Sequence, residues 1–271
     1  MPANISCIVL ALFVPADRHD RVLKAAATGA DAVILDLEDA VAADAKASAR
    51  AGLPDVVRAE SGLLLRINAA GTCWHDEDVA MAARLPLAAV MLAKTETADQ
   101  ARHVAQATGH PVIALVESAR GIANATSIAD AAVRLAFGSI DYAADLAMAH
   151  TRPALNHARA SLVLASRLAG LPAPIDGVTT AIRDDDTVCD DSRHSVEMGF
   201  GGKLLIHPAQ IAPARRGFAP AVHEIAWAQR VFAAAQGDAV FMLDGTMVDP
   251  PVILRARQVL ARTSPPLVDC F

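Results

Sequence analysis

The sequence predicts an α/β protein, a (β/α)8 TIM barrel with a C-terminal helical lid segment. Short apolar runs rich in Val, Ile and Leu recur along the chain, and each is followed by a longer Ala-rich amphipathic stretch. The runs are continuously apolar, which is typical of strands buried on both faces of a parallel sheet. The length of 271 residues suits one barrel plus an extension. A doubly wound open sheet is the alternative.

The apolar runs give the predicted strands in chain order. There are eight, at residues 8–14, 32–37, 63–67, 89–92, 112–116, 135–137, 174–178 and 204–206. Eight strands that alternate with helical stretches suggest a closed barrel. After the last strand, residues 219–235 form another predicted helix, and a final amphipathic stretch ends near Arg262. We therefore expect a catalytic barrel over residues 1–218 and a helical extension over residues 219–271.

Composition and charge exclude several classes of protein. Apolar residues make up 54% of the chain and charged residues 20%, so a large core is expected and disorder is not. The net charge of −6 is scattered, which argues against a nucleic-acid partner. The longest uncharged stretch, 1–16, is shorter than the roughly 18 residues of a membrane span and lacks the features of a secretory signal. We expect no membrane partner and a cytoplasmic location. The acidic run at 184–191 has no calcium-loop spacing and is interpreted as a solvated loop.

Polar residues end the predicted strands from the second to the eighth. A (β/α)8 barrel builds its active site at the carboxyl ends of its strands, so these side chains should converge there. They are Asp36, Glu38, Asp39, Arg66, Asn68, Lys94, Glu117, Asp141, Asp176 and His207. Any one of them alone is more often an ordinary loop residue. Their occurrence on successive strands predicts a polar site.

Glu117 and Asp141 are the candidate metal ligands. Two carboxylates on adjacent strand ends can supply the one or two protein oxygens that Mg²⁺ accepts. Negative charge is crowded beside this pair, which suits residues that hold metal-bound waters, namely Asp36, Glu38 and Asp39. Helix capping is the alternative for these three, and Asp39 is placed to cap a helix beginning near Ala40.

Arg66 lies on a predicted strand inside this acidic group. A planar, permanently charged side chain can be the charge partner of the carboxylates. It can also clamp a carboxylate or enolate oxygen of a ligand. We favour the clamp, and the two roles are compatible.

Motifs along nearly the whole chain resemble those of one family. They are Leu12-Phe13-Val14-Pro15, the block GADAVILDLEDAV at 29–41, Lys46 with Arg50, Arg66-Ile67-Asn68, Lys94, Glu117 with Gly121-Ile122, Phe137-Gly138 with Asp141-Tyr142, Ile206-His207-Pro208, and Asp244-Gly245 with Met247-Val248-Asp249. On these motifs the sequence resembles the citrate lyase beta-subunit-like CoA-ester lyases of the HpcH/HpaI aldolase superfamily. Ala16, Ala93 and Ala147 depart from the family pattern, and they bear on loop shape and substrate choice before they bear on the reaction.

The resemblance implies an enzyme that binds Mg²⁺, or Mn²⁺, and acts on a CoA thioester and a small 2-oxo acid. The implied reaction is reversible carbon–carbon cleavage of a 3-hydroxyacyl-CoA such as malyl-CoA, citramalyl-CoA or citryl-CoA, which gives acetyl-CoA and a 2-oxo acid. The implied assembly is a homotrimer or a dimer of trimers. The alternatives are a CoA-independent metal-dependent 2-oxo acid aldolase, a malyl-CoA thioesterase, and a CoA-binding regulatory subunit without activity.

The resemblance also implies roles for individual residues. Glu117 and Asp141 match the metal ligands, and Arg66 matches the residue that stabilises the thioester enolate. Asp249 matches an acid that exchanges a proton with the acyl α-carbon, from a tail that covers a neighbouring subunit's site. CoA and substrate contacts are implied for Phe13, Arg18, Lys24, Arg66, His207 and Pro208. The alternatives without a role in binding or catalysis are exposed helix charges for Arg18 and Lys24, and a simple turn before Pro250 for Asp249.

Overall fold

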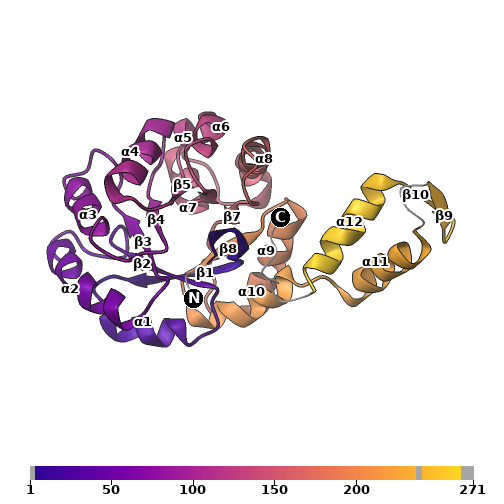
Figure 1. The fold of residues 1–271 in the computed structure, drawn as a ribbon, viewed down its shortest axis with the longest axis horizontal. Helices are drawn as coiled ribbons and strands as arrows, with labels where there is room; N and C mark the ends of the chain where they lie inside the picture. Colours follow the sequence, from indigo (N-terminus) through magenta and orange to yellow (C-terminus); the bar gives the residue numbers. More distant parts are fainter. Residues whose placement is uncertain (1–3, 236–239, 264–271) are drawn as a thin grey trace. The chain divides into compact units, whose positions relative to one another are not determined.

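The computed structural model describes residues 4–235 and 240–263, and the chain divides into two compact units, Met1–Arg215 and Arg216–Phe271. The first unit contains a closed barrel in which each strand pairs in parallel with the next and β8 returns to pair with β1 (Figure 1). The predicted (β/α)8 barrel is confirmed, and the open sheet is excluded.

All eight predicted strands are present. They are β1 (Leu10–Pro15), β2 (Ala32–Asp36), β3 (Leu64–Ile67), β4 (Ala89–Leu92), β5 (Val112–Val116), β6 (Arg134–Phe137), β7 (Ile175–Asp176) and β8 (Gly202–Leu205). Two differ clearly from the sequence-based boundaries. The strand predicted at 174–178 is only two residues long, and the strand predicted at 204–206 begins earlier and ends at Leu205.

Helices follow the strands around the outside of the barrel (Figure 1). They are α1 (His19–Ala26), α2 (Lys46–Ala59), α3 (His75–Ala82), α4 (Ala98–Thr108), α5 (Ala119–Ala123), α6 (Ala125–Ala129), α7 (Ser139–Asp145), α8 (Arg152–Leu168), α9 (Asp185–Glu197) and α10 (Ile211–Phe218), with short 3-10 turns η1 (Ile5–Cys7) and η2 (Pro208–Gln210). Side-chain caps begin α4, α5 and α9. In α4, for example, a Thr97–Gln100 capping box begins the helix and left-handed Gly109 ends it.

Two sequence-based expectations about loops are wrong. No helix begins near Ala40, because Asp36 accepts the backbone N–H groups of Glu38 (2.9 Å) and Ala40 (3.2 Å) and so stabilises a turn; the helix begins at Lys46. Asp39 is therefore not a helix cap. The acidic run at 184–191 is not a loop either. Asp184 caps α9 by accepting the N–H of Thr187 at 3.0 Å, and acidic side chains are favourable at a helix N-terminus.

Strand alternation explains how the barrel interior leads to the site. Apolar side chains fill the interior, including Ala11, Ile34, Leu64, Ile113, Leu115, Ala136, Ile175 and Leu204. In each strand the side chain two residues later faces the same way as the first. The residues two positions after Ile34, Leu64 and Leu115 are Asp36, Arg66 and Glu117, which therefore lie together at the carboxyl end of the barrel. At the opposite end, Arg134 donates to the carbonyl oxygens of Ile5 and Ile8 at 2.7 Å. Burial lowers the pKa of Arg134 to about 10.

The second unit consists of two helices and a hairpin. These elements are α11 (Val222–Ala234), β9 (Phe241–Leu243), β10 (Thr246–Val248) and α12 (Pro250–Ala261). Asp244 and Gly245 join the strands with positive φ values of 50° and 77°, the conformation that a two-residue Asp-Gly hairpin turn requires. The unit has a small core of its own, formed by Ala228, Val231, Val248, Ile253, Ala256 and Val259. Within the described ranges, none of the helices has the length and apolar character needed to cross a membrane.

Candidate active site

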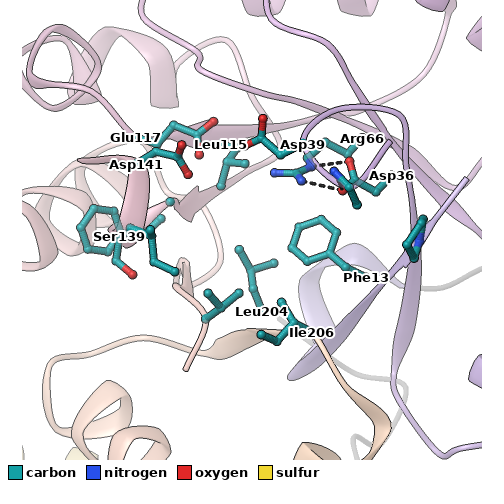
Figure 2. A pocket seen from close by; sticks show the side chains of 16 residues that line it. Phe13, Asp36, Asp39, Arg66, Leu115, Glu117, Ser139, Asp141, Leu204 and Ile206 are labelled. Atoms are coloured by element: carbon teal, nitrogen blue, oxygen red, sulfur yellow. Dashed lines mark hydrogen bonds and ion pairs between the residues drawn. The ribbon is translucent and has the colours of Figure 1, made fainter. Parts of the chain in front are cut away.

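A cavity of about 430 Å³ opens at the carboxyl ends of the barrel strands (Figure 2). Charged side chains line part of it, namely Asp36, Asp39, Arg66, Glu117 and Asp141. The rest of the wall is largely apolar and includes Phe13, Leu115, Phe137, Val178, Leu204 and Ile206. Figure 2 shows Glu117 and Asp141 beside each other, with the Arg66–Asp36 pair further along the cavity. The predicted polar strand ends therefore include residues that line one cavity.

Glu117 is held rigidly beside Asp141. One of its oxygens, Oε1, accepts the backbone N–H of Lys94 at 2.7 Å, and Lys94 adopts a left-handed φ of 48° to present it. A Cβ atom at Gly138 would overlap the other oxygen, Oε2, so only glycine fits there. The Glu117 side chain is 2% exposed. Burial, and next the negative charge of Asp141, raise the pKa of Glu117 to about 8.

These two carboxylates fit a magnesium ion. Within the part of the chain that the structure describes, neither forms an ion pair with a Lys, Arg or His side chain, and no group of three or more His, Cys, Asp or Glu residues surrounds a common metal position. Mg²⁺ typically uses one or two protein carboxylates and takes its other oxygens from water and substrate, whereas structural zinc needs four protein ligands. A cation between Glu117 and Asp141 would also relieve the repulsion that helps to raise the pKa of Glu117.

Arg66 is the centre of a second charged group. Its Nε and Nη2 donate to the two oxygens of Asp36 at 2.7 and 2.6 Å, and its Nη1 lies 3.1 Å from Glu38. The guanidinium also stacks over the ring of Phe13, with 4.6 Å between Cζ and the ring centroid. Burial alone would lower the pKa of Arg66, but the bonds to Asp36 raise it above its usual value. Arg66 is thus a fixed, permanently charged group at the cavity wall.

The structure places the three acidic residues after β2 in different surroundings. Asp36 and Glu38 are ion-pair partners of Arg66, and Glu38 also contacts Nζ of Lys94. Burial raises the pKa of Glu38, although Arg66 and Lys94 oppose this shift. Asp39 lines the cavity and lies 3.7 Å from Nζ of Lys94. Their predicted contact with metal-bound waters stays a prediction.

The residues predicted to contact CoA do not all line the cavity. Phe13 does, but Arg18 is paired with Asp20 at 3.1 Å and Lys24 is exposed on α1. His207 is half-buried and caps η2, with its Nδ1 accepting the N–H of Ala209 at 3.1 Å; Pro208 is the first residue of that turn.

Asp249 lies in the second unit. It is the N-cap of α12, and its side chain accepts the N–H of Val252 at 3.1 Å. The structure thus gives Asp249 a capping role, where the sequence suggests a simple turn as the alternative to the implied catalytic role; the catalytic role stays a prediction.

Two residues near the site received no role from the sequence. Lys46 is buried, and its Nζ donates to the carbonyl oxygens of Leu37 (2.7 Å) and Glu38 (2.6 Å), which fixes the loop after β2. Ser139 begins α7 and lines the cavity. The sequence signal for Lys46 is its place among the motif residues that resemble the family. Nothing in the local pattern distinguished Ser139.

The fold and the site define a (β/α)8-barrel protein with a paired-carboxylate cavity at its strand ends. A profile of the HpcH/HpaI aldolase/citrate lyase family matches residues 10–208. The citrate lyase subunit beta-like protein of Mycobacterium tuberculosis is 38% identical over 261 residues, which cover 93% of this chain and 94% of the relative. A (3S)-malyl-CoA thioesterase of Cereibacter sphaeroides is 35% identical over 266 residues, with 93% of each chain covered.

Solved structures give the same result. The crystal structure of CitE from Mycobacterium tuberculosis in complex with magnesium, acetoacetate and coenzyme A has a TM-score of 0.86 and 36% sequence identity to this chain. The match covers 95% of this chain and 99% of that one. The protein belongs to the HpcH/HpaI aldolase/citrate lyase family. Within it, the chain is similar both to citrate lyase subunit beta-like proteins and to (3S)-malyl-CoA thioesterases.

Proposed function

We propose that the protein is a Mg²⁺-dependent carbon–carbon lyase of the CoA-ester type. It cleaves or forms a 3-hydroxyacyl-CoA, such as malyl-CoA, citramalyl-CoA or citryl-CoA, with acetyl-CoA and a 2-oxo acid as the other partners. The observation that carries the proposal is the Glu117–Asp141 pair, two carboxylates that line one cavity with Arg66 in the same wall. The magnesium, acetoacetate and coenzyme A in the CitE structure support the same ligand classes.

The cleavage changes the substrate in several steps that the protein must assist. The bond between the α- and β-carbons of the acyl chain breaks, and its electron pair passes to the thioester as an enolate. The hydroxyl oxygen becomes the carbonyl oxygen of the 2-oxo acid, and its proton passes to solvent water. Bound between Glu117 and Asp141, Mg²⁺ would supply Lewis-acid chemistry at the hydroxyl and carboxylate. Arg66 then stabilises the enolate oxygen, and Asp249 returns a proton to the α-carbon.

The arginine has donors left for this task. A guanidinium carries five N–H groups. The hydrogen bonds to Asp36 engage one hydrogen on Nε and one on Nη2, and Nη1 forms an ion pair with Glu38 at 3.1 Å. One N–H on Nη1 and one on Nη2 remain for a ligand. Asp36 and Glu38 therefore fix the direction of the guanidinium, so that Arg66 is both their charge partner and the proposed clamp.

Replacing Arg66 with Lys tests the clamp. A lysine keeps the charge but loses the planar fork, so we expect kcat to fall more than about tenfold, or roughly 1.4 kcal/mol of transition-state stabilisation. Steady-state kinetics of condensation would measure this. An effect on KM alone would make Arg66 a binding group and would contradict the enolate role.

Arg18 and Lys24 are proposed to hold the phosphates of CoA. Replacing both with Ala should raise KM for the CoA ester, and the effect should be larger at low ionic strength because salt screens exposed charges. Kinetics at two salt concentrations would measure it. Unchanged CoA affinity at low salt would leave both residues as ordinary exposed charges, which agrees with the Arg18–Asp20 pair.

The direct test of the proposed function is a condensation assay. Purified protein and Mg²⁺ are incubated with acetyl-CoA or propionyl-CoA against a panel of 2-oxo acids, and new CoA esters are followed by mass spectrometry. Formation of a 3-hydroxyacyl-CoA supports the lyase. Release of free CoA from malyl-CoA without carbon–carbon cleavage would indicate a thioesterase. Condensation without any CoA substrate would indicate an aldolase, and inactivity with retained CoA binding would indicate a regulatory subunit.

We further propose that the protein acts in the cytoplasm as a homotrimer or a dimer of trimers, in which the 219–271 extension is a lid over a neighbouring subunit's site. The cap, hairpin and helix that present Asp249 give this extension a defined structure of its own. Light scattering coupled to size-exclusion chromatography would measure the oligomeric state.

A further inference from the structure

A fully buried lysine lies behind the active-site wall. Lys203 on β8 is 1% exposed, and its neighbour Leu204 fills the barrel interior, so the lysine points outward toward α8 and α9. Its Nζ donates to the carbonyl oxygen of Gly177 at 2.7 Å. Asp176 lies opposite Lys203 in the strand register and is itself held by Arg159 (3.1 Å) and Ser195 (2.6 Å).

Burying this ammonium group is costly. Burial lowers the pKa of Lys203, although Asp176 and Asp191 partly oppose the shift. Charged groups are rarely this buried, and an apolar side chain of similar size is often at least as stable in such a place. The hydrogen bond from Lys203 to the Gly177 carbonyl is therefore of interest for the part of the structure that it holds in place.

Gly177 packs directly against the cavity wall. A Cβ atom at this position would overlap Oγ of Ser139 and would lie 2.8 Å from its Cβ and 3.1 Å from the carbonyl oxygen of Phe137. Ser139 is the first residue of α7, and Asp141 is in the first turn of the same helix. Gly138, just before it, makes the close contact with Glu117. Two glycine contacts thus connect the end of β7 to both members of the carboxylate pair.

We propose that Lys203 and Gly177 are positioning residues that set the separation of Glu117 and Asp141. Lys203 holds the Gly177 carbonyl, Gly177 supports the start of α7 through Ser139, and α7 places Asp141 beside Glu117 (Figure 2). The inference rests on the proposed metal site, but neither residue lines the cavity, and a contact to a CoA ester is not required of either.

The test adds a methyl group at Gly177 and measures the affinity of the protein for Mn²⁺. Gly177→Ala adds a Cβ that must displace Ser139, so calorimetry with Mn²⁺ alone should show affinity reduced about tenfold or more, the size of effect expected for supporting partners of metal ligands. Ser139→Gly removes both clashing side-chain atoms. The double variant Gly177→Ala/Ser139→Gly should therefore bind Mn²⁺ as tightly as Ser139→Gly alone, which is not expected if the two changes act independently.

Gly52→Ala is the matched control. There a Cβ would overlap the ring of His19, in contacts between α2 and the start of α1 that do not involve the cavity. Because His19 is exposed, its ring can move aside without any effect on the cavity, so Gly52→Ala should leave Mn²⁺ affinity unchanged. Lys203→Met introduces an unbranched side chain only one heavy atom shorter and removes the donor, so it should weaken Mn²⁺ binding in the same direction as Gly177→Ala.

The outcomes separate this inference from the proposed function. If the wild-type protein binds Mn²⁺ and Gly177→Ala binds it equally well, the positioning role is wrong while the metal site stands. If affinity falls but Ser139→Gly gives no rescue, the contact with Ser139 does not transmit the effect and the proposed route is wrong. If the wild-type protein does not bind Mn²⁺, the proposed metal site fails and this inference fails with it.

Discussion

Glu117→Gln is expected to reduce turnover by roughly 10³-fold or more, which corresponds to about 4 kcal/mol of lost transition-state stabilisation. The amide has the shape of the carboxylate and can still accept the backbone N–H of Lys94 through its oxygen, so the fold should persist. It lacks the negative charge that a hard divalent cation requires. Condensation kinetics and Mn²⁺ calorimetry on the same preparation would measure both effects.

Glu197→Gln provides the control for this change. Its side chain is 66% exposed at the end of α9, so the same substitution there should alter neither turnover nor metal affinity. Full activity of Glu117→Gln in the presence of a chelator would show that the carboxylate pair is not a catalytic metal site.

The raised pKa of Glu117 predicts a pH dependence with a defined sign. The metal binds the ionised carboxylate, so Mn²⁺ affinity should rise about tenfold per pH unit below the pKa of about 8 and should level off above it. In metal-free protein the unfolded carboxyl ionises near 4.5 while the folded one stays protonated. The free energy of unfolding should therefore fall as pH rises from 4.5 to about 8.

Denaturation in chelator at several pH values would measure this contribution, and Glu117→Gln should remove it. Binding that does not change with pH between 6 and 8 would mean that Glu117 is already ionised in the folded, metal-free protein, in contradiction to the burial argument.

The barrel and the approximate location of its site could be predicted from the sequence, because both follow from local patterns. Asp36, Arg66 and Glu117 end or follow apolar runs, and the two-residue period of a strand turns all three toward the cavity. Whether Asp39 caps a helix could not be predicted in this way. Asp36 and Asp39 both had the chemistry of a capping residue, and only the three-dimensional turn shows that Asp36 takes the free N–H groups.

Contacts between distant segments were also outside the reach of local patterns. The close approach of Gly177 to Ser139 joins positions far apart in the chain and depends on a few tenths of an ångström of packing. The burial of Lys203 also could not be predicted, because the predicted strand begins at Leu204 and the structure extends β8 back to Gly202. Residues that support a site are therefore harder to predict than residues that line it.

Asp249→Asn is expected to lower kcat by about 10²-fold or more while leaving stability nearly unchanged, because general acid–base groups contribute about this much. The structure makes this substitution a clean one. Asp249 caps α12 through the N–H of Val252, and Asn is as good an N-cap as Asp, so the variant removes the acid and keeps the cap. Asp249→Ala removes both functions and should in addition destabilise the helix by about 1 kcal/mol.

The same variant tests whether the acid acts on a neighbouring subunit. In a mixed oligomer of Asp249→Asn and Arg66→Lys chains, an intact barrel of the first chain can meet an intact extension of the second. If Asp249 acts in trans, mixing two variants of low activity should restore part of the turnover, measured after subunit exchange has been verified by mass spectrometry. No recovery would count against the trans arrangement. Wild-type turnover by Asp249→Asn alone would remove the residue from the mechanism and leave it as the cap that the structure shows.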